Sequence, residues 1–301
     1  MGNLLGIHSV YSFTGRSRYA TQSYNNMYLF EALTLLLSSY HWRTYNGPIK
    51  LICDDKFYSF IRDNSLEFIW DSIDVSTFKS LPNYIDYSIF WTYPKMFAHA
   101  KQSEPFTSID ADLYINRPII QMGEDVIFGH SEIDDLENLY PDIYKSPLYS
   151  DLFLKYGEIT HPAINTALVN FNNIDIPKEL LEVATNFSKR ITQYTTPSYN
   201  SWAWTIYVEQ KVLGSLIVNG GYKFKSLCDS PYYGSFNTNG YTNEQFSFSK
   251  AGILHLWGDK INYMQNDLDR FDITNKLILE IEQNYPNLMD LVLRMKNIFK
   301  K

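Results

Sequence analysis

Two aspartates stand one residue apart directly after an apolar run, in the segment SIDADLYINRPI at 108–119. If that run is a strand, Asp110 and Asp112 end it, and the alternation of side chains directs both carboxylates to one side of a turn. Paired oxygen ligands suit Mg²⁺ or Mn²⁺, which can bridge to the phosphates of a nucleotide. A second pair, Asp267-Leu-Asp269, lies in a polar stretch before a helix and is typical of a cap or a solvated acid pair. Position therefore selects the first pair as the candidate cation site.

A histidine motif, HLWGDK at 255–260, follows another apolar run. A neutral imidazole such as that of His255 can complete a metal shell, and it favours Mn²⁺ over Mg²⁺. Gly258 would let the backbone approach a diphosphate, and Lys260 would neutralise its negative charge. By itself, a histidine after an apolar run is more often a hydrogen-bonded structural residue, so the motif gains its weight from the combination with the two aspartates.

These residues need strands and helices to position them, and the first half of the chain alternates the two. Apolar runs predict strands at 3–10, 49–55, 66–73 and 106–115. Amphipathic patterns predict helices at 22–40, 56–64 and 88–102, the last with a start or kink near Pro94. Such alternation predicts an α/β fold with a mostly parallel central sheet and helices on both faces. Ligands of these sheets bind beyond the carboxyl ends of the strands, where 54–55 and 110–112 would lie.

The second half is more mixed. We expect strands at 125–131 and 164–172, an apolar segment at 251–257, and helices at 176–193 and 202–216. From Asp272 onward the pattern predicts two further helices, split at Pro286. No repeat or linker stands out, so we expect one domain over 1–265 and a C-terminal helical extension, 266–301, packed on it.

The composition indicates which kinds of binding partner and which compartment to expect. The net charge of −7 argues against a broad surface that binds the phosphate backbone of nucleic acids. The two cysteines form neither a disulfide framework nor a zinc spacing and indicate a reducing compartment. The first residues lack the basic and long apolar regions of a secretory signal, and no apolar run reaches the roughly 18 residues that cross a bilayer. These features predict a cytoplasmic protein.

Taken in order, these motifs resemble the metal-dependent, retaining glycosyltransferases of the GT-A fold. The likeness is to the glycogenin and galactosyltransferase-like family and to the DXD-region family of alpha-galactosyl- and mannosyltransferases. It implies a Rossmann-like GT-A fold, Mn²⁺ (or Mg²⁺) as cofactor, and a nucleotide-sugar donor, with UDP preferred. It also implies retention of the anomeric configuration. We expect a glycan or lipid-linked acceptor, as in polysaccharide biosynthesis, the latter because the basic C-terminal segment could touch a membrane where such acceptors reside.

The resemblance also implies roles for individual residues. The metal ligands would be Asp110, Asp112 and His255. The segments HSVYS at 8–12, WTYPKMFAHA at 91–100 and IDADLYINRPI at 109–119 are similar to those that bind the nucleotide and diphosphate in such enzymes. They contribute the nucleotide-sugar ligands Ser9, Tyr11, Lys95, Asp110 and Ala111, together with Asp55, Gly258 and Lys260. The segments INTALVNFN at 164–172 and WTIYVEQKVL at 204–213 contribute Asn165, Glu209 and Gln210 at the donor sugar and the reacting face.

Several alternatives remain open at this stage. Glu209 could serve as the base of an inverting enzyme, or lie on a helix surface beside a lysine. Asp54 and Asp55 could bind the ribose or base, or cap the helix that begins at Lys56. The basic C-terminal segment 287–301 could touch an anionic membrane from the inner face, or form a solvated helix face. A binding protein without catalysis could use the same scaffold.

Overall fold

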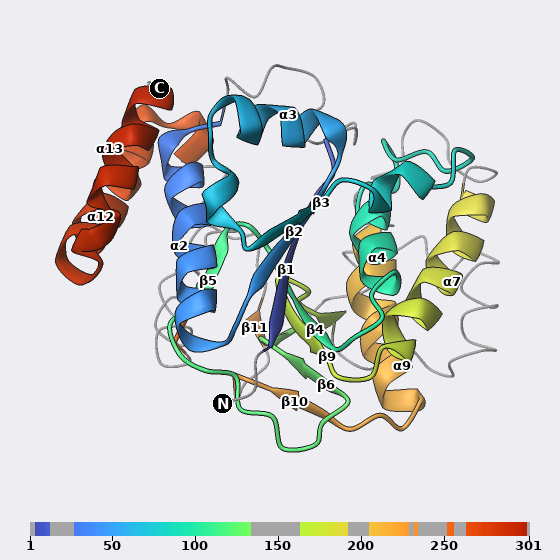
Figure 1. The fold of residues 1–301 in the computed structure, drawn as a ribbon. Coiled ribbons are helices and arrows are strands. Elements are labelled where there is room, and N and C mark those ends of the chain that lie inside the picture. The colour runs from blue at the N-terminus through green and yellow to red at the C-terminus, as the bar shows by residue number, and fades with distance from the viewer. Residues whose placement is uncertain are drawn as a thin grey trace.

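The computed structural model describes residues 4–12, 27–133, 163–191, 205–228, 232–233, 252–255 and 263–299. Its centre is a seven-stranded sheet (Figure 1). The strands are, in their order across it, β10 (Phe224–Ser226), β6 (Val126–Phe128), β9 (Leu168–Phe171), β4 (Phe106–Ile109), β1 (Leu5–Val10), β2 (Ile49–Cys53) and β3 (Ser72–Asp74). Only β9 within this sheet is antiparallel to its neighbours. The predicted α/β class with a mostly parallel sheet is confirmed.

Two smaller sheets complete the described strands. One contains, in order, β11 (Tyr232–Tyr233), β7 (Ser131–Ile133) and β8 (Ala163–Ile164). The other pairs β12 (Ile253–His255) with β5 (Leu113–Ile115). This second pair matters most for function, because β5 begins directly after Asp112 and β12 ends on His255.

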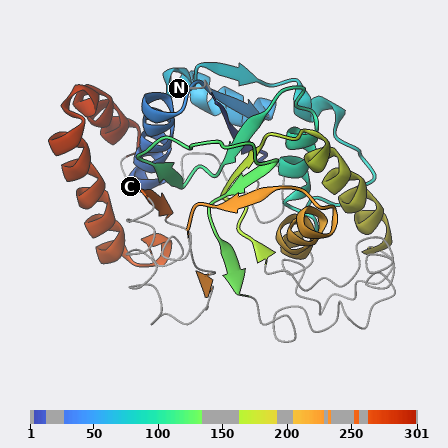
Figure 2. The ribbon, with the colours of Figure 1, turned by 90° about the horizontal axis from the view of Figure 1, so that it is seen from below.

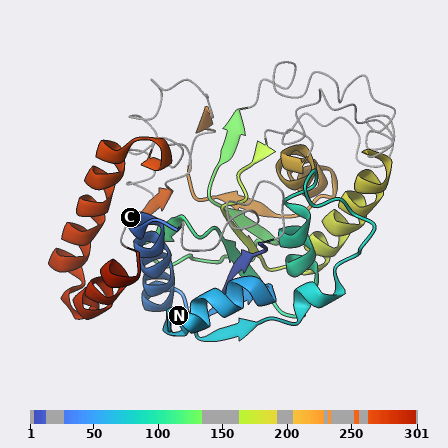
Figure 3. The same cartoon turned by 90° about the horizontal axis from the view of Figure 1, so that it is seen from above.

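Helices cover both faces of the central sheet, as the views along the vertical axis show (Figures 2 and 3). On one side α2 (Leu29–Tyr45) packs on the strands, and α12 (Asp267–Asn284) and α13 (Met289–Ile298) pack on α2. On the other side lie α4 (Tyr93–Ala100), α7 (Asp175–Ile191) and α9 (Leu213–Asn219). The remaining elements are α3 (Asp55–Asp63), the 3₁₀ turns Glu67–Ile69, Thr77–Ser80 and Pro286–Leu288, and the π-helical segment Tyr207–Val212.

Each side has its own apolar core, which explains why the central strands read as continuous apolar runs. The first core joins α2 to the C-terminal helices through residues such as Leu33 and Ile281. Gly6 of β1 is required there, because a Cβ at this position would lie 2.5 Å from the indole nitrogen of Trp42. No helix in the described part of the chain has the length and apolar character needed to span a bilayer.

Several predicted boundaries were wrong. The run 106–115 is two strands in different sheets, since the Leu113 amide donates to the Asp110 carbonyl at 3.1 Å and turns the chain. The run 66–73 begins as a 3₁₀ turn, and only its end belongs to β3.

Helix boundaries differ as well. The helix predicted at 22–40 starts at Leu29 and continues to Tyr45. The helix predicted from Asp272 starts five residues earlier, because the side chain of Asn266 caps it. The aspartates of Asp267-Leu-Asp269 lie in its first turn, where acidic groups favour a helix.

Candidate functional site

The carboxylates of the first aspartate pair lie where β4 ends. The amide of Asp110 donates to the carbonyl of Ala167 at 2.8 Å, which ties this point to the start of β9. The turn closed by Leu113 then carries the chain away from the central sheet, with Asp112 as its last residue before β5. Asp110 therefore belongs to the carboxyl end of a central strand, as the sequence predicted, and Asp112 belongs to the turn that follows.

His255 reaches the aspartates through the pairing of β12 with β5. The two strands are antiparallel, and His255 is the register partner of Leu113. One ligand atom from each of Asp110, Asp112 and His255 lies within 4.8 Å of the other two. Residues 143 positions apart (255 minus 112) are thus brought to one place by three backbone pairs.

The donor set of this cluster fits a divalent cation. The Nε2 atom of His255 faces Oδ1 of Asp112 at 3.6 Å, beyond hydrogen-bond distance. That nitrogen is buried and has no hydrogen-bond partner in the described structure. Buried polar atoms are normally paired, so an unpaired ring nitrogen aimed at a carboxylate is the arrangement expected of a ligand. One imidazole nitrogen and two carboxylates suit Mn²⁺ better than Mg²⁺.

Lys95 lies beside this cluster and joins it to Glu209. Its Nζ atom is 2.7 Å from Oδ1 of Asp110 and 3.1 Å from Oε1 of Glu209, and it donates to the carbonyl of Thr166 at 3.0 Å. Burial alone would lower the pKa of Lys95, but the carboxylates of Asp110 and Glu209 outweigh it and raise the pKa above its ordinary value. The ammonium group is therefore charged throughout the physiological range.

Two threonines explain why Lys95 and Glu209 meet. The hydroxyl groups of Thr92, before α4, and of Thr205, before the π-helical segment, are 2.6 Å apart and buried. Lys95 lies three residues after the first and Glu209 four residues after the second, so both side chains come from the next turn of their helices. A π-helical turn is uncommon and is found often at functional sites. Neither threonine was singled out from the sequence.

The loop between β8 and β9 contributes the next predicted residues. The Asn165 side-chain carbonyl accepts from the Ala167 amide at 2.9 Å and so shapes the turn. Thr166, which the sequence did not mark, donates its hydroxyl to Oε1 of Glu209 at 2.8 Å. Ala111 is half-buried between the two aspartates, and Gln210 is half-buried next to Glu209.

Two residues predicted at the nucleotide lie at the end of β1 and directly after it. Tyr11 packs edge-on against Phe78 at a ring-centroid distance of 5.2 Å, and Ser9 is half-buried within β1. The Asp54 carboxylate accepts from the Phe57 amide at 2.7 Å and from the Ser12 hydroxyl at 2.9 Å. The capping role weighed for Asp54 is thus confirmed, and the same side chain fixes the end of β1.

Asp55 lies in the first turn of α3 and is exposed, with one carboxylate oxygen 3.5 Å from the ammonium group of Lys79. Gly258 and Lys260 lie outside the described residues. The placement of both relative to the aspartates remains a prediction.

Two buried histidines near the cluster were missed by the sequence analysis. Trp70 donates its indole N–H to Nδ1 of His8 at 3.0 Å, and Nε2 of His8 lies 3.0 Å from the Ser38 hydroxyl. Burial lowers the pKa of His8 to about 3, against the opposing effect of the Asp112 carboxylate. Burial, and then the neighbouring His255, lower the pKa of His130 to about 3. A single histidine inside an apolar run, as in GIHSV and VIFGHS, was the available signal.

Comparison with solved structures finds glycosyltransferases among the similar chains. Mouse xyloside xylosyltransferase 1 is 11% identical at a TM-score of 0.36, with 84% of this chain and 96% of that chain covered. The glycosyltransferase GlyE of Streptococcus pneumoniae TIGR4 is 12% identical at a TM-score of 0.40, with 84% and 54% covered. The galactosyltransferase LgtC, in complex with donor and acceptor sugar analogs, is 10% identical at a TM-score of 0.38, with 84% and 86% covered. Similarity at this level carries no conclusion about activity.

A search of curated proteins found no match. A family of unknown function, DUF6734, matches residues 7–295, which include the aspartate turn, Lys95, Glu209 and His255. With nearly its whole length matched, the chain belongs to this family of unknown function, DUF6734.

Proposed function

We propose that the protein is a metal-dependent glycosyltransferase that moves a sugar from a nucleoside diphosphate donor to an acceptor hydroxyl. The observation that carries this proposal is the meeting of Asp110, Asp112 and His255, with Lys95 paired to Asp110 at 2.7 Å. The resemblance of the motifs favours a UDP-sugar as donor and a glycan or lipid-linked acceptor.

The difficult part of this reaction is the departure of a diphosphate while the anomeric carbon becomes cationic. A divalent cation held by Asp110, Asp112 and His255 would neutralise the charge that develops on the leaving group. Lys95 contributes a fixed positive charge next to the same place, and its raised pKa keeps that charge in place. The side chain also orients Asp110, because its Nζ atom is tied to the Thr166 carbonyl and to Glu209.

Glu209 is better suited to hold the site than to act as a base. Its Oε1 atom accepts from the Thr166 hydroxyl at 2.8 Å and lies 3.1 Å from the Lys95 ammonium group. A general base needs a free lone pair aimed at the acceptor hydroxyl, whereas Oε1 of Glu209 is already engaged by the Thr166 hydroxyl and the Lys95 ammonium group. This supports retention over an inverting mechanism with Glu209 as base. Proton NMR of the product tests it, since an inverted anomeric configuration would contradict this assignment.

The main experiment incubates the protein with a panel of UDP- and GDP-sugars and Mn²⁺, and measures the release of free nucleoside diphosphate. We expect nucleoside diphosphate to be released from either the UDP-sugars or the GDP-sugars but not from both, and we expect a chelator to abolish this release. Asp110→Asn and Asp112→Asn should each lower the rate of diphosphate release on the order of 10²–10³-fold, which is the effect of losing one preorganised electrostatic contact.

Asp269→Asn is the matched control, because it alters an exposed Asp-x-Asp pair on α12 and should leave the rate unchanged. Full activity in Asp110→Asn and Asp112→Asn and in the presence of chelator would contradict the proposal. Tight binding of a nucleotide sugar with no turnover would favour the binding protein without catalysis.

A further inference from the structure

The strand that follows Asp112 has little support from its own sheet. β5 has three residues and pairs only with β12 among the described strands. A two-stranded sheet is marginally stable unless it packs against another element. The place of Asp112, and through the pairing that of His255, therefore depends on what holds β5 from outside.

Two helices hold β5 at separate points. Beyond its end, the Asn46 side chain at the end of α2 accepts from the Ile119 amide at 2.7 Å. In its middle, the Tyr114 hydroxyl donates to Oε2 of Glu280 on α12 at 2.9 Å. Tyr114 is buried, and its ring lies 4.9 Å from that of His41 on α2, between centroids. Ring packing alone leaves the orientation of the Tyr114 side chain open, whereas the hydrogen bond to Glu280 fixes it. This bond is strong because its acceptor is a carboxylate.

We propose that Tyr114 and Glu280 are positioning residues of the cation site. Through their hydrogen bond, helix α12 sets the place of β5. In turn, β5 sets the place of Asp112, which precedes it, and of His255, which pairs with Leu113. This inference rests on the proposed function, because it assigns a task to residues that support the same cluster. It gives the C-terminal helices a part in the site although none of their residues belongs to the cluster.

The test measures the affinity of the full chain for Mn²⁺ alone by isothermal titration calorimetry, with the melting temperature recorded for each variant. Tyr114→Phe removes one oxygen, and Glu280→Ala removes the acceptor. Each should weaken Mn²⁺ binding on the order of 10-fold, the lower end of the effect of groups that orient metal ligands. Glu280→Gln retains a carbonyl acceptor and should restore near wild-type affinity. Glu282→Ala, exposed on the same helix, is the matched control and should bind as the wild type does.

The outcomes separate this inference from the proposed function. If the wild type binds no Mn²⁺, or Asp112→Asn binds it as tightly, the cation site fails and this inference with it. If Asp112→Asn loses binding while Tyr114→Phe and Glu280→Ala bind as the wild type does, the cation site stands and the positioning role is overturned, even where the melting temperature falls. If Glu280→Ala does not fold, Tyr114→Phe decides, since it retains the ring packing.

Discussion

Lys95 neutralises two carboxylates that would otherwise face each other across a partly buried space. Its side chain is 17% exposed and that of Glu209 is 7% exposed, so water screens their pairing poorly. Loss of one partner from a buried ion pair leaves an uncompensated charge. The resulting loss of stability is larger than the net stabilisation that the intact pair provides. The same lysine that serves the proposed reaction is therefore also a stability determinant.

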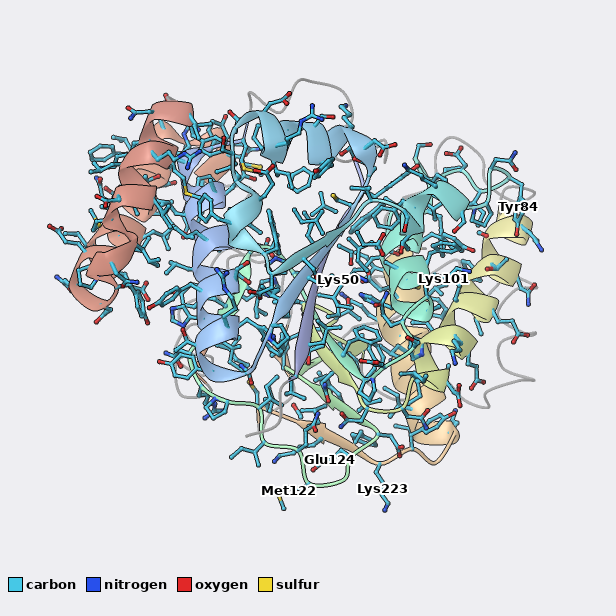
Figure 4. All side chains as sticks on the ribbon, viewed as in Figure 1. Lys50, Tyr84, Lys101, Met122, Glu124 and Lys223 are labelled. Carbon is cyan, nitrogen blue, oxygen red and sulfur yellow. The ribbon has the colours of Figure 1, made fainter. Side chains whose placement is uncertain are left out.

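We predict that Lys95→Met lowers the free energy of unfolding by about 3 kcal/mol. The double variant Lys95→Met/Glu209→Gln should recover much of this loss, because it removes the unpaired charge on Glu209. Urea unfolding monitored by circular dichroism measures both. Lys101→Met is the control, since Lys101 lies at the exposed end of α4 (Figure 4) and should change stability by less than about 0.5 kcal/mol. Equal losses in the Lys95 and Lys101 variants would contradict a buried charge network.

At the scale of elements, the pairing of β5 with β12 depends on how β12 begins. Gly252 has φ of 68°, a conformation that side chains other than glycine adopt at a cost. Its carbonyl accepts from the Asn116 amide at 2.8 Å, and a Cβ there would lie 2.4 Å from Oδ1 of Asn116. The turn that delivers His255 to the cluster thus requires glycine.

We predict that Gly252→Ala weakens Mn²⁺ binding on the order of 10-fold, in the range for displaced ligand supports. Gly221→Ala is the matched control, because Gly221 has the same φ of 68° and open space where a Cβ would be. Both variants should lose stability on the order of 1 kcal/mol because of the positive φ, measured by urea unfolding, and Gly252→Ala should lose more because of its contact with Asn116. Mn²⁺ affinity unchanged in Gly252→Ala would show that β12 places His255 without this turn.

The same elements show which parts of the fold and of the candidate site could be predicted from the sequence. The apolar runs located β1, β2, β4, β6 and β9, because strands buried on both faces need a continuous apolar pattern. They could not show that 106–115 breaks at Asp110, since the turn depends on a hydrogen bond within an otherwise unbroken pattern. The pairing of β12 with β5 and the contact of Lys95 with Glu209 join distant segments, and no local pattern encodes the register or the Thr92–Thr205 contact. The residue types of the site were predictable, and the residues that hold them in place were not.

At the scale of the whole molecule, four of the five histidines in the described part of the chain are buried, namely His8, His41, His99 and His130. Burial lowers the pKa of His8 and His130 to about 3, that of His41 to about 4, and that of His99 well below 6.5. In the unfolded chain each would titrate near 6.5. Between pH 6.5 and about 4 the unfolded state therefore binds more protons than the folded state, so the free energy of unfolding falls as the pH falls through this window.

His41 offers the clean test of this pH dependence, because neither of its ring nitrogens has a hydrogen-bond partner in the described structure. Replacement of His41 leaves no hydrogen-bonding group without its partner, whereas replacement of His8 would leave the Trp70 indole N–H without its acceptor. We predict that His41→Leu reduces the slope of unfolding free energy against pH, between pH 6 and 4.5, by about 1.4 kcal/mol per pH unit, the contribution of one proton. Urea unfolding at a series of pH values measures the slope, with Tyr40→Phe as a control that leaves His41 in place. An unchanged slope in His41→Leu would mean that the folded protein protonates His41 as readily as the unfolded chain does, and acid sensitivity would then have to come from the histidines beside the sheet.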